Sequence, residues 1–71
     1  MKKKIIINGI TSSYNIAHVI DVLNEISGVR CVWINQEEKN AIVKLDFNVD
    51  DNKFSTALNH AGYKTLRVKS I

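Results

Sequence analysis

The order in which the hydrophobic pattern changes along this chain most limits the folds open to it. Residues 2–8 contain a β-branched triple and predict a strand. From Tyr14 onward, apolar residues recur at i, i+3, i+4 and i+7, the spacing of an amphipathic helix. That pattern stops at Ser27-Gly28, because glycine commonly follows the last turn of a helix. The first part of the chain therefore predicts a strand followed by a helix.

The rest of the chain predicts a hairpin, a second helix and a last strand. Residues 29–35 and 41–47 are rich in β-branched or alternating apolar residues and are separated by a short polar turn. Asp50-Asp51 then marks a helix start, where acidic residues complement the dipole, and residues 63–68 predict the last strand. The order βαββαβ predicts an α+β, ferredoxin-like sandwich, with two helices on one face of a four-stranded antiparallel sheet.

The small size of the chain means that its core must be hydrophobic. Seventy-one residues allow one domain, 1–71, and a chain of this length buries only about 60% of its unfolded surface. A single cysteine, Cys31, excludes an intrachain disulfide. With only two separated histidines, His18 and His60, beside that cysteine, we expect no structural zinc and no cofactor. The histidines are interpreted as helix-surface residues. An apolar content of 45% is enough to form the core.

Hydropathy and charge point to the cytoplasm and to a protein partner. No apolar run approaches the roughly 20 residues of a membrane span, so we expect no membrane insertion. The three apolar residues after Lys2-Lys3-Lys4 are too few for a signal peptide, which needs about 7–15. The three lysines are interpreted as the solvated start of a strand. A net charge of +3 is a mild basic bias, which suits an acidic protein partner.

Residues 9–15 read Gly-Ile-Thr-Ser-Ser-Tyr-Asn, between the first predicted strand and helix. This segment resembles the heavy-metal-associated domains of copper chaperones, mercury-binding proteins and metal-pumping ATPases, whose hallmark there is Gly-Met-Thr-Cys-x-x-Cys. Residues 28–35 match the family's second strand, and Ala61-Gly62-Tyr63 matches the end of its second helix. Because these pieces fall in register over nearly the whole chain, the resemblance implies the family's fold and a link to metal transport.

The departure from the family lies at its metal-binding residues. Ser12 and Asn15 stand where the motif has its two cysteines, and neutral oxygen donors are poor ligands for soft Cu(I). The former metal-loop positions are Thr11, Ser12, Ser13 and Asn15, with Tyr63 beside them by resemblance. Ser12, Ser13 and Asn15 are interpreted as helix-capping residues, and an anion site at the helix start stays open as an alternative. Tyr63 is expected to pack on the loop with its hydroxyl outward.

Side-chain alternation along the strands predicts an apolar patch on the uncovered face of the sheet. If the odd-numbered isoleucines of the first strand enter the core, then Ile6 points the other way. By the same reasoning Cys31, Trp33 and Ile42 point outward, and the four residues form a candidate interaction patch. Two alternatives stay open: these are singly exposed apolar residues, or a bulge near Val29 turns Trp33 inward.

No set of residues resembles an active site, so we expect no enzyme. The favoured function is a non-catalytic heavy-metal-associated-like domain without its cysteine pair, acting as a protein-interaction or docking module linked to metal transport. The alternative is a copper-type chaperone or ATPase N-terminal domain that binds metal through atypical ligands. A homodimer through the open sheet face is a further possibility. Nucleic acid is not expected, because the aromatic signature of RNA-recognition domains is missing.

Overall fold

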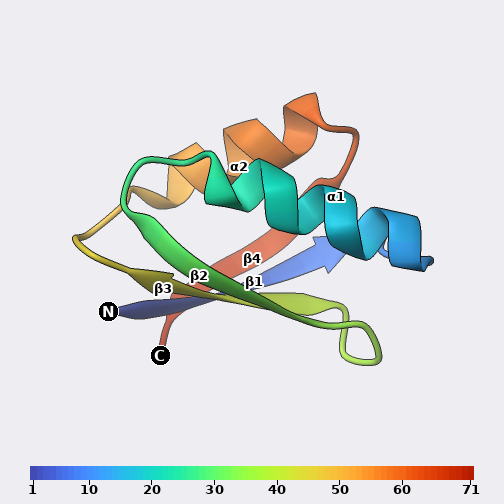
Figure 1. Ribbon diagram of the computed structural model, residues 1–71, viewed down its shortest axis with the longest axis horizontal. Coiled ribbons are helices and arrows are strands. Elements are labelled where there is room, and N and C mark those ends of the chain that lie inside the picture. Colours follow the sequence, from blue (N-terminus) through green and yellow to red (C-terminus); the bar gives the residue numbers. More distant parts are fainter.

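Each change of pattern in the sequence becomes a change of element in the computed structural model, which describes residues 1–71. The elements are β1 (Lys2–Asn8), α1 (Ser13–Asn24), β2 (Val29–Asn35), β3 (Asn40–Leu45), α2 (Asp51–His60) and β4 (Lys64–Ser70). Figure 1 shows both helices packed on the same face of the sheet. The predicted ferredoxin-like sandwich is confirmed. Neither helix has the length and apolar character needed to cross a membrane.

The sheet has the strand order β2-β3-β1-β4, with every neighbouring pair antiparallel. The two predicted hairpin strands lie together at one side, and the first and last strands pair at the other. One face of this sheet is covered by the helices, and the opposite face, called here the open face, carries no other element (Figure 1). Every side chain of the sheet therefore belongs either to the core or to the open face.

Three element boundaries differ from the prediction by two residues. α1 ends at Asn24, although its apolar pattern continues to Ile26. The ends of β3 and β4 also differ, each for a local reason. β3 ends at Leu45 rather than at Phe47. Beyond Leu45 the backbone N–H of Asp46 donates to the carbonyl of Gly28, and Phe47 turns to lie against Gly28. At the other side, β4 continues to Ser70, because its pairing with β1 extends as far as Lys3.

The core forms where the helices meet the sheet. Each helix contributes a buried pair at i and i+4, which is Val19 with Leu23 in α1 and Phe54 with Leu58 in α2. The sheet meets them with alternate residues of its central strands. These are Ile5, Ile7, Ala41, Val43 and Leu45. Since residues two apart lie on the same face of a strand, the intervening residues are left for the open face.

Lys3 does not belong to a solvated strand start, as the sequence had suggested. It lies on the core face of β1, in alternation with Ile5 and Ile7, and is only 8% exposed. Its ammonium group donates to the carbonyl of Val49 at 2.8 Å and to the carboxylate of Asp51 at 2.5 Å. A lysine can take such a position because its long apolar stem lies in the core while its charge reaches a polar partner. The pair fastens the start of α2 to the first strand.

Candidate functional site

The loop between β1 and α1, which corresponds to the family's metal loop, ends in a well-formed helix cap. Ser12 has extended backbone angles and its hydroxyl accepts the N–H of Asn15 at 3.3 Å. This confirms the capping interpretation for Ser12, since a serine oxygen at this position pairs an otherwise unbonded N–H of the first turn. Ser13 is instead the first helical residue, and it is exposed.

The side chain of Asn15 links the first turn of α1 to the preceding residues of the loop. Its oxygen accepts from the backbone N–H of Thr11 at 3.2 Å, from the Thr11 hydroxyl at 3.1 Å and from the Ser12 hydroxyl at 3.0 Å. An amide oxygen has two lone pairs, so three donors use its full accepting capacity. The oxygen at one former cysteine position is thus bonded to the residues around it.

Tyr63 closes this cluster from the end of α2, and its hydroxyl points inward rather than outward. The residue is 6% exposed, and its oxygen accepts from the Asn15 amide nitrogen at 3.1 Å. The same oxygen lies 3.0 Å from Nδ1 of His18. The Tyr63 hydroxyl has a proton of its own, which it can donate to Nδ1 in the tautomer that leaves this nitrogen unprotonated. Gly9 permits the approach, since a Cβ there would lie 3.3 Å from the Tyr63 ring.

His18 is the member of this cluster that the sequence interpretation missed. It is half-buried, with its ring 5.5 Å from that of Tyr63 and 5.7 Å from that of Tyr14. Its position three residues after Asn15 puts both side chains on one face of α1, and this spacing was the available signal. His60, by contrast, is exposed as expected.

The residues Thr11, Ser12, Asn15, His18 and Tyr63, called here the loop cluster, offer hydrogen-bond donors and acceptors that bond to one another. No group of three or more His, Cys, Asp or Glu side chains gathers anywhere in the chain in a way that could hold a metal ion. Cys31 lies on β2 and pairs across the sheet with Lys44, away from this loop. Ser12 bonds to Asn15 rather than to His18, so no histidine activates its hydroxyl. The arrangement stabilises the loop and does not form a catalytic site.

The four residues of the predicted patch all lie on the open face. Trp33 pairs directly with Ile42, and Cys31 is the next open-face residue along β2. A bulge does occur between Val29 and Cys31, but the regular register resumes at once and Trp33 remains 51% exposed. Ile6 is not directly opposite Ile42: β1 places Lys4 there, so Ile6 and Ile42 are diagonal neighbours.

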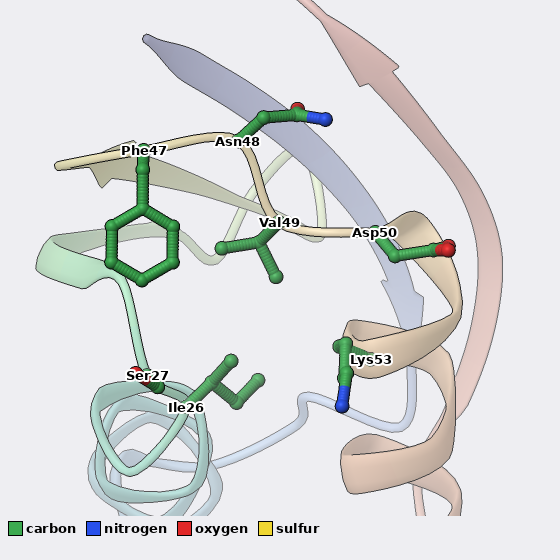
Figure 2. Close-up of a pocket in the computed structure, with 7 residues that line it drawn as sticks. All are labelled: Ile26, Ser27, Phe47, Asn48, Val49, Asp50 and Lys53. Carbon is green, nitrogen blue, oxygen red and sulfur yellow. The ribbon is translucent and has the colours of Figure 1, made fainter.

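A separate cleft lies at the other end of α1 from the loop cluster. Figure 2 shows Phe47 and Val49 on one side of it and Ile26 on the other, with Asp50 and Lys53 at the start of α2. Its volume is about 460 Å³. None of the candidate site residues predicted from the sequence lines this cleft. It arises because Gly28, with φ of +97°, lets Phe47 and Val49 come against the turn after α1.

Comparison with known proteins supports the relationship that the loop and fold suggest. No family model matches the chain. The copper chaperone CopZ of Enterococcus hirae is 29% identical over 65 residues, which cover 90% of this chain and 94% of that protein. Oxidized MerP from Ralstonia metallidurans CH34 is 25% identical with a TM-score of 0.86, over 99% of this chain and 97% of MerP.

A copper-binding domain from HMA7, a P-type ATPase, shares the fold with a TM-score of 0.85 at 21% identity, over 99% of this chain and 96% of that domain. These relatives are metallochaperones and metal-binding domains rather than enzymes, in agreement with the expected absence of catalysis. The chain has only one cysteine. It therefore resembles the copper-chaperone-like, heavy-metal-associated domains in sequence and fold, and has Ser12 and Asn15 where their motif carries the cysteine pair.

Proposed function

We propose that this chain no longer carries a soft metal at the β1–α1 loop and acts as a protein-interaction module linked to metal transport. The observation that carries the proposal is the loop cluster. The side chains at both former cysteine positions are neutral and are bonded to each other, to Thr11 and to Tyr63. The relatives, a copper chaperone and a copper-binding domain of a P-type ATPase, support the link to metal transport.

The energetics of ligand exchange oppose Cu(I) binding at this loop. A thiolate site contributes on the order of 10 kcal/mol or more to metal affinity. Hydroxyl and amide oxygens are hard, neutral donors that do not replace this contribution. To face a metal, the Asn15 oxygen would also have to leave the donors of Thr11 and Ser12. The loop therefore keeps the shape of a metal loop while its polar groups are paired internally.

Titration with Cu(I) under reducing conditions, against a competing chelator, tests this proposal. We expect no 1:1 complex of submicromolar affinity in the wild-type chain. The double variant Ser12→Cys/Asn15→Cys should acquire such a complex, because it places two thiolates at the motif positions. Both should be measured in a Cys31→Ser background as well, which removes the thiol on the open face.

Each outcome of the titration decides between the proposals. A submicromolar 1:1 complex in the wild-type chain that persists in Cys31→Ser would establish metal carriage through atypical ligands. A complex that disappears in Cys31→Ser would place the metal at the open face, and either result would overturn the proposal. Failure of the double-cysteine variant, if it remains folded, would show that replacement of these two side chains does not explain the loss.

A further inference from the structure

The charges of the sheet all have one sign on the open face. Pairing across the strands puts Lys44 beside Cys31 and Lys2, Lys69 beside Lys4, and Arg67 beside Ile6. Directly paired residues of antiparallel strands share a face. Lys64 joins them, because it pairs with Asn8, which follows the core-facing Ile7 on β1. The six cations of the open face are Lys2, Lys4, Lys44, Lys64, Arg67 and Lys69. None of the seven acidic residues of the chain lies in a strand.

These six cations have no acidic partner within the chain. The two ion pairs of the structure are Lys3–Asp51, on the core side, and Arg30–Asp46, at the bulge of β2. The acidic residues lie instead in the helices, the turns and the loops. They are Asp21, Glu25, Glu37, Glu38, Asp46, Asp50 and Asp51. The open face is thus an unneutralised positive surface on one side of the molecule (Figure 1, lower side of the sheet).

Along the central cross-strand row of this face, apolar side chains lie at one end and cations at the other. One cross-strand row runs from Trp33 on β2 through Ile42 on β3 to Lys4 on β1 and Lys69 on β4. At about 4.8 Å between strands, the row is roughly 14 Å long. Its apolar end is a half-exposed indole against an isoleucine, and its other end is a pair of ammonium groups. Tryptophan and arginine are the residues that most often anchor protein interfaces, and Arg67 lies in the neighbouring row.

We infer that the open face docks a segment of a partner protein in which carboxylates flank bulky apolar side chains. This inference rests on the proposed function and names the surface and the class of partner. The carboxylates would lie over β1 and β4, and the apolar side chains over Trp33 and Ile42. Complementary charge of this kind sets the orientation of a partner and speeds its association.

Two other occupants fit the face less well. A second copy of the chain would set six cations against six, and like charges oppose such contact. Single-stranded nucleic acid would satisfy the cations, but it is held by stacking of successive bases on aromatic rings. The open face has a single aromatic ring, that of Trp33, since the other four aromatic residues lie outside the strands. They are Tyr14, Phe47, Phe54 and Tyr63.

The test is titration of the isotope-labelled chain with a synthetic peptide in which glutamates flank a leucine–phenylalanine pair, followed by NMR. We expect chemical-shift changes on the open-face residues of the four strands, and affinity that falls as salt is raised. Lys4→Glu/Lys69→Glu should weaken binding about tenfold or more, since it sets like charges against each other. Trp33→Ala should weaken it independently. Lys53→Glu, which changes a charge on α2, is the matched control and should leave affinity unchanged.

Several results would overturn the inference. Shift changes confined to α1 and the β1–α1 loop would place docking elsewhere, as would unchanged affinity in Lys4→Glu/Lys69→Glu. Tighter binding of an oligothymidylate than of the peptide would identify a nucleic-acid surface. An apparent mass near twice 8.0 kDa, reduced to the monomer by Trp33→Asp, would identify a homodimer. If peptide binding failed while the chain still bound no Cu(I), the docking inference alone would be wrong and the loss of metal carriage would stand.

Discussion

Replacing Lys3 by methionine removes the charge that joins β1 to the start of α2 while keeping an apolar stem of similar length. The largest loss is the bond to the Val49 carbonyl, which is buried and has a length of 2.8 Å. A hydrogen bond from a charged donor contributes about 1.5–3 kcal/mol. The ion pair with Asp51 adds about 0–1 kcal/mol, because that carboxylate is 53% exposed. The Lys3 ammonium lies 6.0 Å from the centre of the Phe54 ring, so a methionine thioether would be near this ring and would offset part of the loss. We expect a net loss of about 2 kcal/mol in the free energy of unfolding.

Urea denaturation followed by circular dichroism measures this loss directly, and thermal melting checks it. For a domain of 60–100 residues, about 1 kcal/mol shifts Tm by roughly 4–8 °C, so Lys3→Met should lower Tm by about 8–16 °C. Lys4→Met is the matched control: it is the same change one residue along β1, on the open face and without an ion pair, and should stay within about 0.5 kcal/mol. Asp51→Asn should cost about 1 kcal/mol or less. The reasoning that the bond to the Val49 carbonyl makes the largest contribution would be refuted by either of two results. One is a Lys3→Met variant with an unchanged free energy of unfolding, and the other is an Asp51→Asn variant that is destabilised as much as Lys3→Met.

Two glycines and the central tyrosine give further predictions. Gly28→Ala should destabilise the fold by about 3 kcal/mol, since φ is +97° and the new Cβ would lie 2.8 Å from Phe47. Gly62→Ala has φ of +94° but open space, so denaturation should show only about 1–2 kcal/mol; equal costs at the two sites would disprove the steric contribution. Tyr63→Phe should cost about 1 kcal/mol and shift the NMR signals of the Asn15 side-chain amide, and an unchanged amide spectrum would contradict the bond between them.

Much of the fold could be predicted because its determinants are local. Apolar residues recur every second position in the strands and at helical spacing in the helices, and these patterns involve only near neighbours. The same is true of Ser12 as the cap of α1 and of Gly28 in the turn after it. The element order βαββαβ then indicates the ferredoxin-like topology. The boundaries were less predictable, since Phe47 leaves β3 to meet Gly28, a contact set by tertiary packing.

The candidate site was only partly predictable, for the same physical reason. Tyr63 is 48 residues from Asn15 and 45 from His18, and no local pattern reports which way its hydroxyl turns. Lys3 was assigned to solvent because of its charge, although strict alternation with Ile5 already placed it on the core face. Charge outweighed periodicity in that interpretation. The Val49 carbonyl and the Asp51 carboxylate, which both accept from the Lys3 ammonium group, make its burial acceptable.

The open-face cations were missed because they come from both ends of the chain. Lys4 and Lys69 are far apart in sequence and become neighbours only when β1 pairs with β4. The outward residues of the hairpin, Trp33 and Ile42, were easier to identify because their strands are adjacent in sequence. The net charge of +3 gives too low an impression of the positive charge on the open face, because it also counts the acidic residues that lie elsewhere in the chain.

The two bulges of the sheet affect how this protein meets other chains. They fall on β2 and β4, the outer strands, where Arg30 and Leu66 are the extra residues. An outer strand normally offers a row of unpaired backbone groups that invites another strand to add on. An extra residue breaks the regular spacing of that row and increases the local twist. The two outer strands are thus protected against the addition of another strand, and self-assembly into extended β-structure is disfavoured. Contact with a partner is left to the side chains of the open face.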